Sequence, residues 1–278
     1  MTRANVSGLG LRSRHRPRLA ARGWPEPLAE NATASNHLRR PVNWIFFDCF
    51  NTLLDDFDPS GDESGLGSLP ELAVALGACN TPDQFVAAYH AERIAPGPEH
   101  PERPLDARLA AALQSLGRLP DAELLPVVNQ LLVRWHDEYP RSLRITPGAR
   151  ETLEHWYGRR RLAVVSNFFV AGLPLTFLQD FGLDHFFEFV IDSAALGYRK
   201  PGPRIFEAAL ARAGARVEEV TFIGDRLDLD IIPAHALGMR VVHLDRSATR
   251  PGHVARDARF PSVVHHDELR DGPIHPLK

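Results

Sequence analysis

The run Trp44-Ile45-Phe46-Phe47, followed by Asp48, decides how the rest of the sequence is interpreted. A short, continuous apolar run is typical of a β-strand that is covered on both faces. Such strands occur in parallel sheets with helices packed on either side. The abrupt change to an acid marks the end of the run. The stretch therefore predicts a buried strand that presents Asp48 at one edge of an α/β sheet.

The same pattern repeats in the second half of the chain, where apolar runs alternate with helical patterns. This alternation is typical of βαβ units and a parallel sheet. Right-handed crossovers place the carboxyl ends of all strands at one edge, so we expect a doubly wound parallel α/β sheet. The expected strands are 162–165, 189–191, 220–223 and 241–244, and the expected helices are about 148–159, 171–181, 203–213 and 229–237.

A helical unit is inserted between the first and second strands. Four helical patterns there, around 69–77, 81–95, 105–116 and 121–138, are separated by breakers rich in Pro and Gly. The expected organisation is a disordered, Arg-rich leader (1–40), an α/β core (41–58 and 141–250), the helical insertion (59–140) and a C-terminal tail (251–278).

Polar residues follow the strands at the edge where open α/β sheets bind ligands. Asp48 follows the first strand, Ser166 and Asn167 follow the second, the third leads into Lys200, and the fourth gives Asp225. Each of these residues alone is weak evidence, but together they place two acids, an amine and a hydroxyl at one edge. We expect an acidic, metal-binding site for an anionic substrate.

Four motifs, in this order, resemble those of the haloacid dehalogenase (HAD)-like hydrolase superfamily, in its capped phosphatase and dehalogenase branch. The resemblance covers about 42–245 and implies a Rossmann-like core with a mobile helical cap at 59–140. Most members are phosphohydrolases. The motifs are Phe-Phe-Asp-Cys-Phe-Asn-Thr-Leu (46–53), Val-Val-Ser-Asn (164–167), Gly-Tyr-Arg-Lys-Pro (197–201) with Ile-Phe (205–206), and Phe-Ile-Gly-Asp (222–225) followed by Asp230.

The resemblance implies catalytic and substrate-binding roles. Asp48 would be the nucleophile, which attacks phosphorus and forms an aspartyl phosphate that water then hydrolyses. Lys200 would neutralise negative charge and orient Asp48. The Ser166 hydroxyl and backbone amides near Asn51 and Asn167 would hold the phosphoryl oxygens.

The resemblance also implies a Mg²⁺ cofactor. Its oxygen ligands would be the Asp48 carboxylate, the backbone carbonyl of Phe50 and Asp225. Asp230 would support these ligands without touching the metal, or would bind the metal through a water molecule. Asp228, in the same loop, is expected to be solvated or to cap the following helix.

Phe50 departs from the family pattern. Most phosphatases of the family carry a second Asp at this position, which protonates the leaving alcohol and then activates water. A phenyl ring cannot do either, and general acid–base help is worth about 10²–10⁴-fold. Asp55 and Asp56, just past the motif, are candidates to replace the missing acid.

Two alternatives to a phosphatase of a small phosphorylated metabolite stay open. Related dehalogenases also carry an aromatic residue where Phe50 stands, so a hydrolytic 2-haloacid dehalogenase acting on a halogenated metabolite is one. Those enzymes, however, lack the Gly-Asp metal motif that ends in Asp225. A weakly catalytic protein that binds a phosphorylated ligand or a protein partner is the other.

Composition restricts the class of partner. Of 278 residues, 44% are hydrophobic and 24% charged, and the net charge is −3. Residues 1–40 hold eight Arg and two Glu, which leaves −9 for the rest. An acidic fold argues against nucleic acid or an anionic membrane as partner and favours a small ligand. Two cysteines imply no disulfide framework, and there is neither a membrane span nor a secretory signal, so we expect a cytosolic protein. The oligomeric state is not predicted.

Two further groups of polar residues lie in the helical insertion and near the C-terminus. In the helical insertion, Tyr89, His90, Arg93 and His136 are candidates for substrate contact, although each is more simply a solvated helix residue. The late histidines match no compact ligand set and are expected in a mostly solvated tail, in which Val263, Val264 and Leu269 pack as a last edge element. These histidines are His253, His265, His266 and His275.

Overall fold

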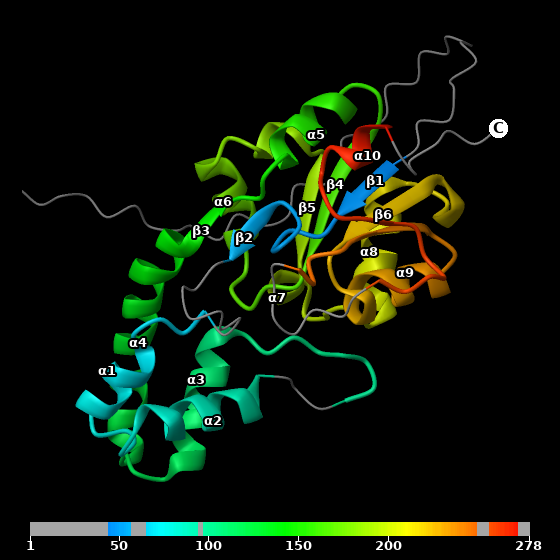
Figure 1. Cartoon of the computed structure of the whole chain (residues 1–278). Coiled ribbons are helices and arrows are strands. Elements are labelled where there is room, and N and C mark those ends of the chain that lie inside the picture. Colours follow the sequence, from blue (N-terminus) through cyan, green and yellow to red (C-terminus); the bar gives the residue numbers. More distant parts are fainter. Residues whose placement is uncertain (1–43, 57–64, 94–96, 249–255, 272–278) are drawn as a thin grey trace, which may run out of the picture. The chain divides into compact units, whose positions relative to one another are not determined.

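The computed structural model describes residues 44–56, 65–93, 97–248 and 256–271 (Figure 1). The expected leader, 1–40, lies outside the described residues. All six strands of the main sheet are parallel, in the order β5-β4-β1-β6-β7-β8. Their bounds are β1 Trp44–Phe47, β4 Arg161–Ser166, β5 Phe189–Asp192, β6 Val220–Gly224, β7 Arg240–Leu244 and β8 Ser262–Val263.

Helices cover both faces of this sheet, as the continuous apolar runs require. In β1, Ile45 and Phe47 pack in the same core as α5 (Ala149–Trp156) and α6 (Leu173–Asp180), whereas Trp44 and Phe46 pack with α8 (Pro203–Ala213) and α9 (Ile232–Ala236). The side chains alternate because successive residues of a strand point to opposite faces. The doubly wound α/β fold is confirmed.

The segment between the first two core strands is helical, and a small antiparallel sheet joins its two ends. Strands β2 (Leu54–Asp56) and β3 (Leu143–Ile145) pair with each other, which was not predicted because three-residue strands carry no readable period. The helices between them pack against one another: α1 Leu69–Ala75, α2 Pro82–Glu92, α3 Leu105–Leu116 and α4 Asp121–Ser142.

The structure differs from the prediction at the helix expected over 229–237. A π-helical turn (Leu227–Ile231, η3) precedes α9, and the N–H of Ile231 reaches back five residues to the carbonyl of Arg226. Such wide turns are frequent at functional sites. The remaining short elements are η1 Asp184–Phe186, α7 Ser193–Leu196, η2 Val217–Glu219 and α10 Glu268–Asp271.

The C-terminal segment packs more closely than expected. Val263 lies in β8 at the edge of the sheet and Leu269 is fully buried, which confirms their predicted packing. The expectation of a solvated tail is wrong for His266, which is 1% exposed, although its neighbour His265 is exposed. His253 and His275 lie outside the described residues.

None of the described helices is both long enough and apolar enough to span a membrane. The cytosolic location stays a prediction.

Candidate active site

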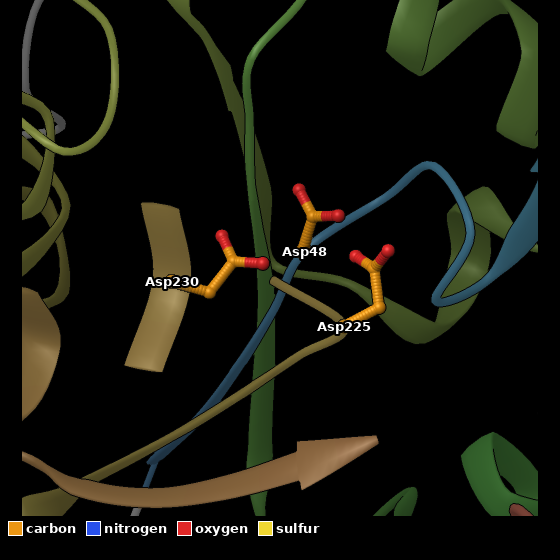
Figure 2. Close-up of side chains that lie close together, drawn as sticks. All are labelled: Asp48, Asp225 and Asp230. Atoms are coloured by element: carbon orange, nitrogen blue, oxygen red, sulfur yellow. The ribbon is translucent and has the colours of Figure 1, made fainter. Parts of the chain in front are cut away.

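Three carboxylates converge at the carboxyl edge of the sheet. Asp48 follows β1, Asp225 follows β6 and Asp230 belongs to the π-helical turn η3. One oxygen of each lies within 4.8 Å of the others, and all three side chains are buried (Figure 2). The predicted pairing of Asp48 with Asp225 is therefore present, with Asp230 as a third member.

Strand register and one glycine bring these acids together. Phe47 is aligned with Ile223 in the parallel β1–β6 pair, and the N–H of Asp48 donates to the carbonyl of Ile223 (2.8 Å). Gly224 leaves the room that the third acid needs, since a Cβ atom there would lie 2.5 Å from Oδ2 of Asp230. Any larger residue at this position would displace the Asp230 carboxylate.

Lys200 lies between two of these acids. Its Nζ donates to Oδ1 of Asp48 and to Oδ1 of Asp230, each at 2.6 Å, and the side chain is buried. Burial alone would lower the pKa of Lys200, but the charges of Asp230 and Asp48 outweigh it and raise the pKa. The ammonium group is therefore charged and held against Asp48.

The carboxylates carry more negative charge than Lys200 neutralises. Burial raises the pKa of Asp225 well above its usual range, and the charges of Asp48 and Asp230 add to this. Burial also raises the pKa of Asp230, to about 6, against the opposing effect of Lys200. A buried excess of negative charge with oxygen donors is the environment that a hard divalent cation fits. The residues present are thus compatible with the metal that the sequence motifs imply.

The loop behind Asp48 is supported by Thr52, within the first motif, and by His266, which lies outside the recognised motifs. The Thr52 hydroxyl donates to Oδ1 of Asp225 (3.3 Å), and Nε2 of His266 donates to the Thr52 carbonyl (2.6 Å). Burial lowers the pKa of His266 to about 4, so its ring is neutral near pH 7. Sequence reasoning missed this support, because 214 positions separate Thr52 from His266.

A cavity of about 790 Å³, counted with the space at its mouth, opens above the carboxylates. Of the four polar candidates in the insertion, Arg93 lines the cavity, whereas Tyr89 is buried elsewhere and His90 and His136 are exposed. Sequence reasoning did not single out Glu102, Arg108, Tyr139, Arg199 or Arg226, which also line it.

The residues expected to bind phosphate differ in whether they line the cavity. Asn51 and Asn167 line the cavity, but Ser166 is fully buried and is not among the lining residues. The Asn167 side chain exchanges two hydrogen bonds with the backbone of Lys200 (2.8 and 2.9 Å). The N–H of Asn51 already donates to the carbonyl of Leu54 (2.6 Å). Asn167 therefore orients the lysine loop. The Oγ of Ser166 makes no hydrogen bond within the described part of the chain, and its phosphate-binding role stays a prediction.

The Phe50 side chain belongs to an aromatic cluster. Its ring stacks on Phe168 (centroids 4.5 Å apart) and meets the rings of Tyr139 and Phe177 edge-on. This packing fixes an apolar group on the cavity wall where a phosphatase of this type would carry its acid.

The two acids of β2 point in different directions. Asp55 is buried, and its Oδ1 accepts hydrogen bonds from Thr146 (2.9 Å) and Arg246 (2.7 Å). Asp56 lines the cavity, and Oδ2 of Asp56 accepts a hydrogen bond from the Tyr139 hydroxyl (2.9 Å). Of the two candidates for the missing acid, only Asp56 thus faces the cavity.

Asp228 is exposed and pairs with Arg226 (2.9 Å). Its predicted solvation is confirmed.

Comparisons with known proteins agree with this architecture. Residues 42–238 match the family model described as haloacid dehalogenase-like hydrolase. A glyceraldehyde 3-phosphate phosphatase of Methanopyrus kandleri is 45% identical over 65 residues, which cover 23% of this chain and 28% of that protein. One of the same name from Methanothermobacter thermautotrophicus is 30% identical over 139 residues, 48% of this chain and 60% of that protein. The chain thus spans less than two thirds of the length of either relative.

Among solved structures, a 2-haloacid dehalogenase of Pseudomonas syringae pv. Tomato has a TM-score of 0.61 and 20% identity, with 83% of this chain and 97% of that chain covered. A likeness at this identity concerns the fold alone. The family match extends from the strand before Asp48 to beyond Asp230 and so contains the whole carboxylate site. The chain belongs to the haloacid dehalogenase-like hydrolases.

Proposed function

We propose that this chain is a Mg²⁺-dependent phosphatase of a small phosphorylated metabolite, with Asp48 as its nucleophile. The observation that carries the proposal is the position of the Asp48 carboxylate, which lies on the cavity floor, 2.6 Å from the Lys200 ammonium and beside Asp225 and Asp230. The two phosphatase relatives described above act, by their names, on glyceraldehyde 3-phosphate, and this supports a phosphorylated substrate.

In this proposal an oxygen of Asp48 attacks phosphorus, the bond from phosphorus to the ester oxygen breaks, and the leaving oxygen takes up a proton. Water then attacks the phosphorus of the aspartyl phosphate. The bond from phosphorus to the Asp48 oxygen breaks, which releases inorganic phosphate and restores the carboxylate. Lys200 holds Asp48 in position and offsets the negative charge of the phosphoryl group.

The residues that would hold Mg²⁺ are Asp48, Asp225, the backbone carbonyl of Phe50 and, directly or through water, Asp230. When bound, the cation neutralises charge that would otherwise repel the anionic phosphoryl group from the carboxylates.

We also propose that the helical insertion, 59–140, acts as a cap over the site. Arg93, Arg108 and Tyr139 of this region line the same cavity as Asp48, which supports that role. Closure of a cap excludes water and places substrate contacts around the reacting group.

Asp56 is proposed as the proton donor to the leaving group, in place of the acid that Phe50 lacks. Its carboxyl group lines the cavity, and Tyr139 fixes one of its oxygens. Asp55 is already engaged by Arg246 and Thr146.

The experiment that tests the function is phosphate release from a panel of small phosphate esters, with Mg²⁺, with a chelator, and with Mg²⁺ restored. We expect activity only with the metal, and a fall of about 10³-fold or more in Asp48→Asn. Asp180→Asn, the same change at an exposed position, is the control and keeps full activity. Phosphate release that survives chelation or the loss of Asp48 contradicts the proposal.

The dehalogenase alternative rests on one specific observation, the packing of Phe50 among aromatic rings on the cavity wall. Halide release from 2-halo acids, measured in the same samples, tests it. Chelator-resistant halide release without phosphate release would replace the phosphatase proposal. Binding of phosphorylated compounds without release of either ion would indicate a weakly catalytic binding protein.

A further inference from the structure

The wall of the cavity carries four arginines that the proposed chemistry does not use. Arg93, Arg108, Arg199 and Arg226, here called the arginine cluster, all line the same cavity as Asp48. Arg93 and Arg108 come from the helical insertion, and Arg199 and Arg226 come from loops of the core. Such a concentration of guanidinium groups in a generally acidic protein requires an explanation.

Arg108 is held in one orientation. It is 2% exposed, its Nε donates to the Arg103 carbonyl (2.7 Å), and a terminal nitrogen donates to Oε1 of Glu102 (2.6 Å). Its guanidinium group lies over the ring of Phe169, 4.7 Å from the centroid. Glu102 is fixed in turn, because its Oε2 accepts a hydrogen bond from the Ser193 hydroxyl (2.6 Å). This part of the wall is therefore built before any ligand arrives.

Arg199 is not neutralised in the same way. Its side chain is 13% exposed, and its Nε lies 3.8 Å from Glu102, too far for a hydrogen bond. That buried Nε makes no hydrogen bond within the described part of the chain. Burial lowers the pKa of Arg199, against the opposing effect of Glu102, and the positive charges of Arg108, Arg93 and Arg226 lower it further. An anion beside Arg199 would relieve this repulsion.

The positive charges of the cluster exceed the carboxylates that pair with them. Glu102 pairs with Arg108, and the exposed Asp228 pairs with Arg226. Among the described residues, no ion pair of Arg93 is found, and Arg199 has only the distant Glu102. A self-contained structural network would balance its charges, whereas this one leaves two guanidinium groups available to an anion.

We infer that the arginine cluster binds a second anionic group of the substrate, a carboxylate or a second phosphate. The inference rests on the proposed function, since it takes the reacting phosphoryl group to lie at Asp48. Arg199 directly precedes Lys200 in the chain and both residues line the cavity, so we take the two anionic groups of the substrate to be separated by only a few carbon atoms. The substrate class is thus a small phosphate ester with an anionic group at its other end.

The test uses phosphonates, which a phosphatase does not hydrolyse, so binding is measured apart from turnover. The full chain with Mg²⁺ is titrated calorimetrically with propylphosphonate, 3-phosphonopropionate and propane-1,3-bisphosphonate. These share a phosphonate and differ in the other end, which is neutral, a carboxylate or a second phosphonate. We expect at least one of the two probes with an anionic end to bind about 10-fold or more tightly than propylphosphonate. The better of the two identifies the second group.

Substitutions test which arginines cause the tighter binding of probes with an anionic end. In Arg199→Gln and in Arg93→Gln the preference should fall to within about threefold, while Arg199→Lys, which keeps the charge, should retain part of it. Arg216→Gln, an identical change at an exposed arginine outside the cavity, should retain all of it. Circular dichroism melting verifies that each variant is folded.

Equal affinity for the three probes, no binding of either probe with an anionic end, or a preference that persists in both glutamine variants overturns the inference. Failure of the phosphatase proposal is a separate result, visible as absent phosphate release in the ester panel. Equal phosphate release from esters with and without a second anionic group would support the phosphatase function and contradict the inference about the arginine cluster.

Discussion

The floor of the cavity is acidic and its wall is aromatic and basic. The floor consists of Asp48, Asp225 and Asp230 with Lys200, all positioned by the ends of strands or by the loops that follow them. The wall takes Arg108 and Tyr139 from the helical insertion. In the functions proposed above, the strand ends supply the reactive groups, and the contacts that select a substrate come from the helical insertion together with neighbouring core loops.

The two halves are nevertheless joined next to the reactive lysine. The segment between α2 and α3 forms backbone hydrogen bonds with the lysine loop, from Glu102 N–H to the Gly197 carbonyl and from Arg199 N–H to the His100 carbonyl, both 2.9 Å. Leu105 N–H also donates to the Phe169 carbonyl (2.9 Å). A change in the wall can therefore reach Lys200 through a short connection.

The largest expected effect is on the floor, in Lys200→Met. Removal of the ammonium leaves Asp48 and Asp230 buried without their partner, and breaking a buried ion pair costs about 3–5 kcal/mol of folding free energy. Urea unfolding measures the stability, and kcat/KM on any ester hydrolysed by the wild type should fall for every substrate alike. Loss of activity toward some esters only would mean that Lys200 helps to select the substrate, which contradicts the separate roles of the cavity floor and wall.

An intermediate effect on activity is expected at Asp56, which lines the cavity and is the proposed proton donor. Asp56→Asn should lower kcat by about 10²-fold through loss of the proton donor, and Phe50→Asp introduced into that variant should restore part of the rate. Asp55→Asn, the matched change one position away, should lower stability by weakening the pair with Arg246 and leave the rate of the folded enzyme unaltered. Equal rates and pH profiles in the wild type and Asp56→Asn would remove Asp56 from the mechanism.

The smallest effect on activity is expected at His266, which lies outside the cavity and supports the loop after Asp48; the expected effect there is on stability. The unfolded chain protonates this residue below its ordinary pKa of 6.5, but the folded protein does so only near 4. Stability is therefore lost as pH falls from 6.5 to 4, by about 3 kcal/mol from this residue. His266→Gln, which keeps a donor for the Thr52 carbonyl, should flatten that part of the stability curve measured by urea unfolding.

His265→Gln is the matched control, because His265 is the exposed neighbour of His266, and this variant should follow the wild-type curve. Identical pH dependence in the two variants would show that burial of His266 contributes nothing to acid stability.

The strands and the acids at their ends could be predicted from local sequence. An apolar run such as 44–47 is buried wherever it lies, and parallel strands bring their carboxyl ends to one edge, so Asp48, Lys200 and Asp225 were placed correctly relative to the sheet. The motifs added Asp230, whose approach depends on the absence of a side chain at Gly224.

Which of two neighbouring acids faces the cavity could be known only from the folded protein. Asp55 and Asp56 are equivalent in sequence, but the β2–β3 pairing turns one toward Arg246 and the other toward Tyr139. Because successive strand residues alternate in direction, a difference of one position moves a side chain from the site to the core.

The sheet, the strand-end acids and the family could therefore be predicted from the amino-acid sequence, because apolar runs and short motifs are local properties of the chain. The arginine cluster, the support of Thr52 by His266 and the orientation of Asp56 depended on tertiary structure. These contacts join residues far apart in the chain, and no local pattern encodes which distant partner a charged or polar side chain will meet on folding.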